Sequence, residues 1–396
     1  MSGIFKFIVV GRGMMGSAAA KYLSRASAGV AVIGPGEPAD KASHQGVFAS
    51  HYDEARITRT IDPDPVWALL ANRSIARYAE IERESGIPFY HDVGCLMVGP
   101  EQSSGNPYIG GILSAAEQLG VQTELLDDRA LASRFSYFGF EAFSEGVFEP
   151  SNAGHINPRA LVSAQSLLAE RQGARLIDET VLSIRKEGET VVVRTDTGAE
   201  YRAEGVLLAA GGFSIAENLL ARSVQMSVYA RTVTFFEVSE TEAAAFSGMP
   251  SLIYQPRDAK KHIYLLPPVR YPDGKLYLKI GGDPDDLAVT GKDDMVRWFQ
   301  SGGRSSVREH HVEIVRELVP KIDAERASMA ACVVSQTATN YPFIAAAADP
   351  AIAVVTGGCG AAAKSSDEIG RLGASLLLNG SLADEGYPVG FNAHFA

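Results

Sequence analysis

The feature that most constrains this chain is a glycine-rich turn near its N-terminus. Residues 5–10 (FKFIVV) are apolar and predict a β-strand, and residues 18–23 predict a helix. Between them, Gly11, Gly13 and Gly16 match the pattern G-x-G-x-x-G. In such a strand–turn–helix unit the glycines permit a tight turn, let the backbone approach a pyrophosphate, and let the helix pack against the strand. The stretch therefore predicts a dinucleotide site, without deciding between nicotinamide and flavin dinucleotides.

The second predicted strand, residues 30–33, does not end in the acid that this pattern usually carries for the ribose hydroxyls. Residues 34–36 (Gly-Pro-Gly) follow it, and the nearest carboxylate is Glu37, beyond the proline. Two alternatives stay open at this point. Either Glu37 reaches back to the ribose, or backbone groups of residues 34–36 bind it with water.

Composition excludes several classes of protein. The chain has 396 residues, enough for two or three domains, and its formal net charge of −11 argues against nucleic acid as a partner. It has no apolar run of 18 residues and no signal-peptide pattern, so we expect a cytoplasmic protein without a membrane span. Cys95, Cys332 and Cys359 are widely spaced, which predicts free thiols and no metal site.

The order of predicted elements indicates an α/β protein. Residues 89–98 predict one strand, residues 157–173 predict a helix with Asn157 as its N-cap, and residues 175–208 predict three strands. A second glycine-rich turn, residues 357–360, precedes a C-terminal helix. We therefore expect a Rossmann-like domain built from discontinuous segments, with an interleaved α+β substrate domain that carries a mostly antiparallel sheet. The expected division is residues 1–86, 150–216 and 325–396 for the first domain, and residues 87–149 and 217–324 for the second.

Five segments carry a resemblance to a known family. They are the N-terminal glycine loop, SHQG (43–46) followed by ARITR (55–59), VLLAAGGF (206–213), MAACVVSQT (329–337) and GGCGAAAKSS (357–366). Together they resemble FAD-dependent amine and amino-acid oxidoreductases of the D-amino-acid oxidase superfamily, and within it monomeric sarcosine oxidase and N-methyltryptophan oxidase. The similarity extends over nearly the whole chain. It implies that the dinucleotide is FAD.

The resemblance also implies roles for individual side chains. Arg59 and Lys364 match two cations that hold a substrate carboxylate, a task suited to a guanidinium fork. Tyr264 matches an active-site tyrosine that lines the pocket or bonds the carboxylate. Arg56 matches a cation beside the flavin, where it stabilises negative charge on the reduced ring. Lys279 is implied to lie near flavin N5, bonded through water, and to promote reaction with oxygen. Without the resemblance, these side chains would be assigned to solvated loops and strand faces.

The remaining implied residues contact the cofactor. From the sequence alone Cys332 is a small apolar residue on a strand, and the resemblance implies that its sulfur forms an 8α-thioether bond to FAD. The other implied cofactor contacts are Gly11, Gly13, Met14, Met15, Gly16, Glu37, Ser43, His44, Val181, Ala210, Gly211, Gly358, Gly360 and Lys364.

The implied reaction is oxidation of the C–N bond of an amino acid or N-alkyl amino acid. A hydride passes to flavin N5, water hydrolyses the imine, and oxygen takes the electrons to give hydrogen peroxide. Ring-bearing residues of the family are replaced here by Asp283, Val334 and Ala361, which predicts a roomier pocket and a larger N-methyl or cyclic amino acid as substrate. The alternatives are an FAD dehydrogenase with another electron acceptor, and a flavoprotein without turnover.

Overall fold

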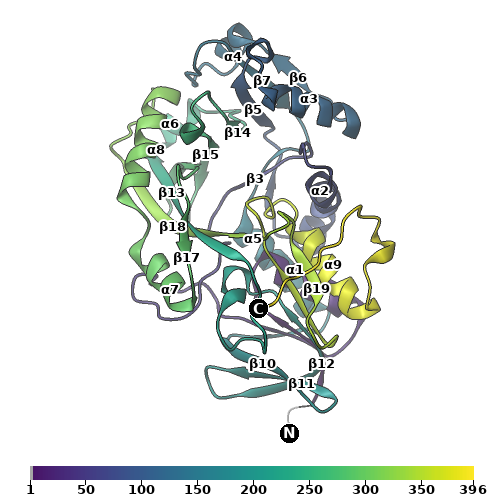
Figure 1. Ribbon diagram of the computed structural model, residues 1–396. Helices are drawn as coiled ribbons and strands as arrows, with labels where there is room; N and C mark the ends of the chain where they lie inside the picture. The colour runs from purple at the N-terminus through teal and green to yellow at the C-terminus, as the bar shows by residue number, and fades with distance from the viewer. Residues whose placement is uncertain (1–2) are drawn as a thin grey trace.

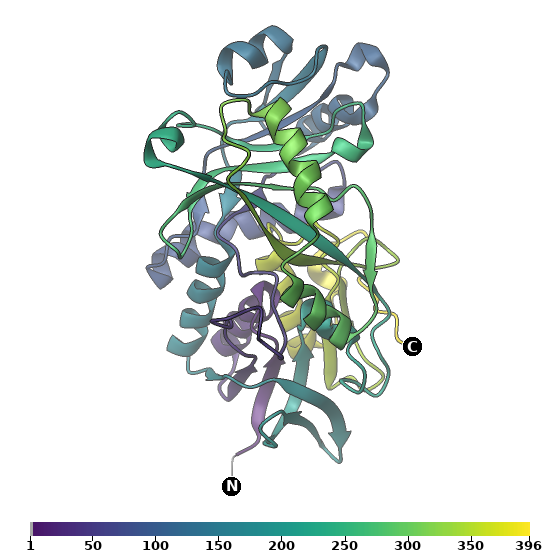
Figure 2. The ribbon, with the colours of Figure 1, turned by 90° about the vertical axis from the view of Figure 1, so that its left-hand side faces the viewer.

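The computed structural model describes residues 3–396 and contains two large β-sheets that lie one above the other in Figures 1 and 2. The lower sheet has eight strands, in the order β10-β11-β12-β1-β2-β9, with β20 paired to β12 and β19 paired to β20. Its strands are β1 (Phe5–Val10), β2 (Val30–Ile33), β9 (Arg175–Ile177), β10 (Val181–Glu187), β11 (Thr190–Thr195), β12 (Glu200–Leu208), β19 (Phe343–Ala346) and β20 (Ile352–Thr356). These strands come from the beginning, middle and end of the chain.

Parallel pairing of β1 with β2 and β12 forms the centre of the lower sheet. Phe7 and Val9 of β1 pack on one face, and Ile8 and Val10 pack on the other. This burial on both sides explains why residues 7–10 are a continuous apolar run. Helices α1 (Met14–Ala26), α5 (Pro158–Arg171) and α9 (Ser366–Asn379) lie together over one face, and α2 (Pro65–Ser85) packs against α5 and α9.

The upper sheet has nine strands, in the order β17-β13-β16-β15-β14-β5-β7-β6, with β18 paired to β13. Its strands are β5 (Cys95–Pro100), β6 (Glu124–Leu126), β7 (Ser144–Glu149), β13 (Ser227–Val238), β14 (Ser251–Tyr254), β15 (Ile263–Arg270), β16 (Leu276–Gly281), β17 (Leu287–Val289) and β18 (Ala327–Gln336). All pairs are antiparallel except that of β5 with β14. The accompanying helices are α3 (Pro107–Leu119), α4 (Asp128–Arg134), α6 (Glu240–Ala244), α7 (Lys292–Ser301) and α8 (Ser305–Leu318).

The single strand expected over residues 89–98 is wrong. The segment forms β4 (Tyr90–His91) and β5, which belong to different sheets. Gly94 separates them in the left-handed region, with φ +77°, and a Cβ there would lie 2.6 Å from the ring of Phe148. Strand β4 joins a small sheet in the order β3-β8-β4, with β3 (Arg56–Thr58) and β8 (Gly154–Ile156).

The fold class predicted from the sequence is confirmed: a discontinuous nucleotide-binding sheet is combined with a mostly antiparallel second sheet. The expected division into residue ranges stays a prediction. Strand β18, which that division gives to the first domain, is hydrogen-bonded to β13 in the upper sheet. Over residues 3–396, no helix combines the length and apolar character needed to cross a membrane.

Candidate cofactor and substrate site

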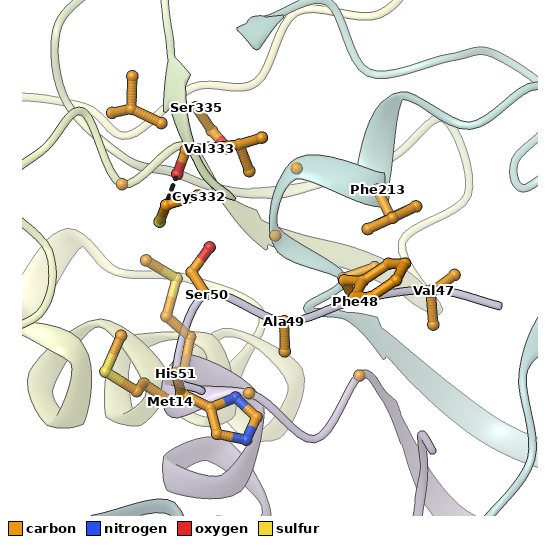
Figure 3. Close-up of a pocket in the computed structure, with 18 of the residues that line it drawn as sticks. Met14, Val47, Phe48, Ala49, Ser50, His51, Phe213, Cys332, Val333 and Ser335 are labelled. Carbon is orange, nitrogen blue, oxygen red and sulfur yellow. Dashed lines mark hydrogen bonds between the residues drawn. The ribbon is translucent and has the colours of Figure 1, made fainter. Parts of the chain in front are cut away.

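A cavity of about 450 Å³ lies between the two sheets. Its walls come from both glycine-rich turns, from the loop of residues 47–52, and from strands β13, β15, β16 and β18. Figure 3 shows this loop entering the cavity opposite Cys332, Val333 and Ser335. The cofactor residues expected from the sequence that line it are Gly11, Gly13, Met14, Met15, Val181, Ala210, Gly211, Cys332, Gly358 and Gly360.

The first glycine-rich turn has the geometry of an anion site. A Cβ on Gly11 would lie 2.4 Å from the carbonyl oxygen of Ala209, and one on Gly16 would lie 1.9 Å from the carbonyl oxygen of Gly11. Gly16 is therefore a packing residue that does not line the cavity. Gly13 is the N-cap residue of α1, and no side chain caps this end of the helix. The N–H groups of the first helical turn thus lack intrahelical partners and are available to a phosphate.

Glu37 does not line this cavity. Its carboxylate accepts hydrogen bonds from Arg159 at 2.6 and 2.8 Å and forms an ion pair with Lys41 at 2.9 Å. These cations hold the pKa of Glu37 below its usual value despite the opposing effect of burial. Of the two alternatives for the ribose, the structure therefore favours residues 34–36, of which Gly34 and Pro35 line the cavity beside Arg12.

The loop of residues 47–52 carries a Ser-His pair into the cavity wall, and it is not the pair predicted from the sequence. Ser43 is exposed, and His44 is outside the cavity with its ring edge-on to Phe48. The second Ser-His pair of the sequence, Ser50 and His51, lines the cavity instead. Residues 47–49 line the cavity wall ahead of Ser50 and His51, and residues 43–44 lie before this segment and outside the wall. The proximity of the second pair to Arg56 is the signal that could have identified it.

His51 lines the cavity and was missed by sequence reasoning. Its Nδ1 is buried and has no hydrogen-bond partner among residues 3–396. A Cβ added to Gly13 would lie 3.9 Å from this atom, so the ring faces the phosphate-binding turn. Burial lowers the pKa of His51 to about 4. The ring is therefore neutral at pH 7, with one nitrogen open to a hydrogen bond from or to a bound molecule.

The opposite end of the cavity brings together three residues predicted from the sequence. Cys332, Arg56 and Tyr264 all line it, and Arg56 Nη2 lies 3.6 Å from Cys332 Sγ. Tyr264 packs over Gly281, where an added Cβ would lie 2.4 Å from the phenol oxygen. Burial raises the pKa of Tyr264, so this phenol stays protonated.

Lys279 does not reach the cavity. Its side chain is fully buried, and Nζ donates a hydrogen bond of 2.6 Å to Asp53 Oδ2 and another to the carbonyl oxygen of Ala55. Asp53 also forms an ion pair of 3.2 Å with Arg56. Burial lowers the pKa of Lys279 to about 8, although Asp53 opposes this effect. Lys279 is therefore enclosed by other residues and is not part of the cavity wall.

Arg59 and Lys364, predicted to hold a substrate carboxylate, meet at a carboxylate of the chain itself. Asp62 Oδ2 lies 3.3 Å from Arg59 Nη2 and 3.0 Å from Lys364 Nζ. All three side chains are mostly buried, and neither cation lines the cavity, although Ala362 and Ala363 beside Lys364 do. Burial, and then the charge of Arg59, lower the pKa of Lys364 to about 8.

The two carboxylates in these clusters were missed by sequence reasoning. Asp53 lies three residues before Arg56, and Asp62 lies three residues after Arg59. This spacing of opposite charges is the signal that was available. Elsewhere in residues 3–396, no three His, Cys, Asp or Glu side chains gather closely enough to hold a metal ion.

Comparison with known proteins identifies the family of this chain. The family model of FAD dependent oxidoreductases matches residues 6–376, and the chain therefore belongs to this family of flavin enzymes. Monomeric sarcosine oxidase of Streptomyces avermitilis is 27% identical over 398 residues, covering 98% of this chain and 97% of that protein. N-methyl-L-tryptophan oxidase of Citrobacter koseri is 27% identical over 209 residues, covering 52% and 53%.

Among solved structures, NikD, described as an unusual amino acid oxidase essential for nikkomycin biosynthesis, has the same fold. The match has a TM-score of 0.76 at 21% identity and covers 100% of this chain and 98% of that one. The cavity itself fits FAD: it joins an uncapped helix N-terminus to the buried Nδ1 of His51, which has no hydrogen-bond partner in the part of the chain that the structure describes. The chain is therefore an FAD-dependent oxidoreductase, as the resemblance implied.

Proposed function

We propose that this enzyme oxidises the C–N bond of an amino acid or N-alkyl amino acid, with oxygen as electron acceptor and hydrogen peroxide as product. The observation that carries the proposal is the convergence of Arg59 and Lys364 on the carboxylate of Asp62. Two mostly buried cations that already bind one carboxylate are suited to bind another. The sarcosine and N-methyltryptophan oxidases among its relatives act on molecules with this group by name.

In this proposal Arg59 and Lys364 orient the substrate by its carboxylate, with its amine toward the cofactor cavity. FAD, when bound, supplies the acceptor for the hydride leaving the carbon beside nitrogen and passes the two electrons to oxygen. The amine must enter the reaction unprotonated, because an ammonium nitrogen has no lone pair to form the C=N bond. Water then hydrolyses the imine. The Arg56 guanidinium, which lines the cavity, stabilises negative charge there.

Asp62 competes with the substrate for the same two cations. We expect Asp62→Asn to lower KM for an amino-acid substrate about tenfold, because the amide removes the internal negative charge that the substrate must displace. Steady-state kinetics at fixed oxygen measure this effect, and an amine without a carboxylate is the control, whose KM should not fall. An unchanged or raised KM for the amino acid would remove Asp62 from the proposal.

Cys332 is proposed as a covalent attachment point for FAD. Cys332 lines the cavity, and Arg56 Nη2, 3.6 Å from its sulfur, can stabilise negative charge there. The sulfur would replace a hydrogen of the flavin 8-methyl group, and the two electrons released would reduce the flavin, which oxygen would then reoxidise. We expect the yellow chromophore to remain with the polypeptide after acid precipitation, and to appear in the supernatant of Cys332→Ser. Cys95, fully buried in the upper sheet, provides the control, because Cys95→Ser should retain the chromophore. Free FAD released from the unmodified protein would contradict the bond.

A dehydrogenase with another electron acceptor is the second candidate. It is favoured by the position of Lys279, which is fully buried on Asp53 and does not line the cavity. A cation in direct contact with the reacting oxygen would be expected to line the cavity, whereas in the oxidase proposal Lys279 acts on oxygen only through its charge, from behind the cavity wall. Oxygen consumption in the presence of a substrate separates the two candidates.

The test of the proposed function is bleaching of the bound flavin without oxygen. A panel of N-alkyl, cyclic and D-amino acids should contain compounds that remove the absorbance near 450 nm, the usual flavin band. Esters of the same compounds, which lack the negative charge, should react far more slowly. Bleaching by no member of the panel would favour a flavoprotein without turnover.

A further inference from the structure

Asp53 is a buried carboxylate that joins three parts of the chain. Its side chain is 4% exposed. Besides Lys279 of β16 and Arg56 of β3, it binds Tyr271 from the turn between β15 and β16, whose hydroxyl donates a hydrogen bond of 2.7 Å to Oδ1. A buried carboxylate with a partner on each oxygen is a fixed element of structure.

The surroundings of Lys279 explain why this carboxylate matters. Tyr264 of β15 presents its ring, with the centroid 5.7 Å from Lys279 Nζ. Arg56 of β3, His155 of β8 and Cys332 of β18 lie within electrostatic range of the same ammonium group. Burial lowers the pKa of His155 to about 3, so that ring is uncharged at pH 7.

Among these neighbours, Asp53 is the one carboxylate. Without it, the Lys279 ammonium would be buried next to the permanently charged guanidinium of Arg56. Both burial and a neighbouring like charge favour the neutral amine of a lysine. A neutral Lys279 would no longer contribute positive charge beside the cavity.

We propose that Asp53 is a positioning residue that keeps Lys279 protonated and holds Lys279 and Arg56 in place beside the cofactor cavity. The inference rests on the proposed function, in which Arg56 stabilises negative charge in the cavity and the charge of Lys279 acts on the reaction with oxygen from behind the cavity wall. It predicts that Asp53 acts on the reaction through Lys279 and not by contact with the substrate or cofactor.

The direct test is titration of Lys279 in protein labelled with ¹³C at the lysine Cε carbons. The signal absent from Lys279→Met identifies the residue. In the unaltered protein its midpoint should lie near the pKa of about 8. In Asp53→Asn, which keeps the size of the side chain but not its charge, the midpoint should fall by about one pH unit or more.

Asp53→Glu, which retains a carboxylate, should keep the midpoint within about half a pH unit of the unaltered protein. If Asp53→Asn does not fold, the single variant Arg56→Met is compared with the double variant Asp53→Asn/Arg56→Met, which has lost one charge of each sign. The titration midpoint of Lys279 should again be lower in the variant that lacks Asp53. An unchanged midpoint in either comparison would overturn the inference.

A kinetic readout distinguishes failure of this inference from failure of the proposed function. The flavin is reduced photochemically, so no substrate is needed, and its reoxidation by oxygen is followed across pH. At pH 8, Asp53→Asn should slow reoxidation about fivefold, in proportion to the loss of protonated Lys279. When it is added to Lys279→Met, the same substitution should have no further effect. If Lys279→Met alone leaves reoxidation unchanged, the proposed oxygen chemistry fails, whereas the titration still decides the role of Asp53.

Discussion

Arg59→Met is expected to lower kcat/KM for an amino-acid substrate about a hundredfold. Truncating one member of a buried, hydrogen-bonded charge pair costs about 2–5 kcal/mol, and about 2.7 kcal/mol corresponds to a factor of 100. Methionine keeps much of the length and apolar surface of the arginine stem while removing the guanidinium. The measurement is the steady-state rate with the compound that bleaches the flavin most rapidly.

Two controls separate a role in carboxylate binding from general damage. Arg25→Met, at a side chain 49% exposed with surface ion pairs, should leave kcat/KM within about twofold. Arg59→Lys should fall between Arg59→Met and the unaltered enzyme, because it keeps the charge but loses the two-pronged donor. An equal loss with substrates that have and lack a carboxylate would refute the assignment of Arg59.

We expect Gly16→Ala to lose its fold, and Gly13→Ala to fold but to bind FAD poorly. At Gly16 the new Cβ would lie 1.9 Å from the backbone oxygen of Gly11, and no flexible side chain can yield there. We expect Gly16→Ala to destabilise the fold by about 4 kcal/mol or more and to accumulate as insoluble protein. Gly13 has φ −83°, and its nearest contact would be His51 Nδ1 at 3.9 Å, so Gly13→Ala should fold normally.

Gly13→Ala should nevertheless bind FAD poorly, because its methyl group occupies the space through which the pyrophosphate approaches the backbone. Thermal unfolding of the two variants without added cofactor measures the first difference. Flavin absorbance after purification and incubation with excess FAD measures the second. A Gly13→Ala protein that retains a full complement of flavin would contradict the proposed pyrophosphate position.

Much of the cofactor site was predictable because its signals are local. The strand, turn and helix around Gly11–Gly16 are adjacent in the chain, and each glycine has a separate steric reason. Cys332, Arg56 and Tyr264 were predicted from a family resemblance, and the structure brings all three to one end of the cavity. Their roles in catalysis and binding stay predictions.

Other predicted residues lie outside the cavity wall, because their positions depend on tertiary contacts and on the path of the chain. Glu37 is drawn away from the cavity by Arg159, which lies 122 positions later on α5. Ser43 and His44 had the expected residue types, but the path of residues 47–52 brings Ser50 and His51 to the cavity. The strand expected over residues 89–98 is interrupted at Gly94 because the ring of Phe148, from β7, occupies the space where a Cβ would lie.

The sequence by itself determined the class of fold and the glycine-rich turn of a dinucleotide site, because apolar periodicity and turn glycines act over short stretches of chain. The set of cations was implied by the family resemblance. Only the tertiary structure decided which carboxylates face those cations. Lys279 meets Asp53 and Lys364 meets Asp62 across separations of 226 and about 300 residues. Charge state in a buried site depends on such distant neighbours, since both desolvation and the nearest opposite charge arise only when the chain has folded.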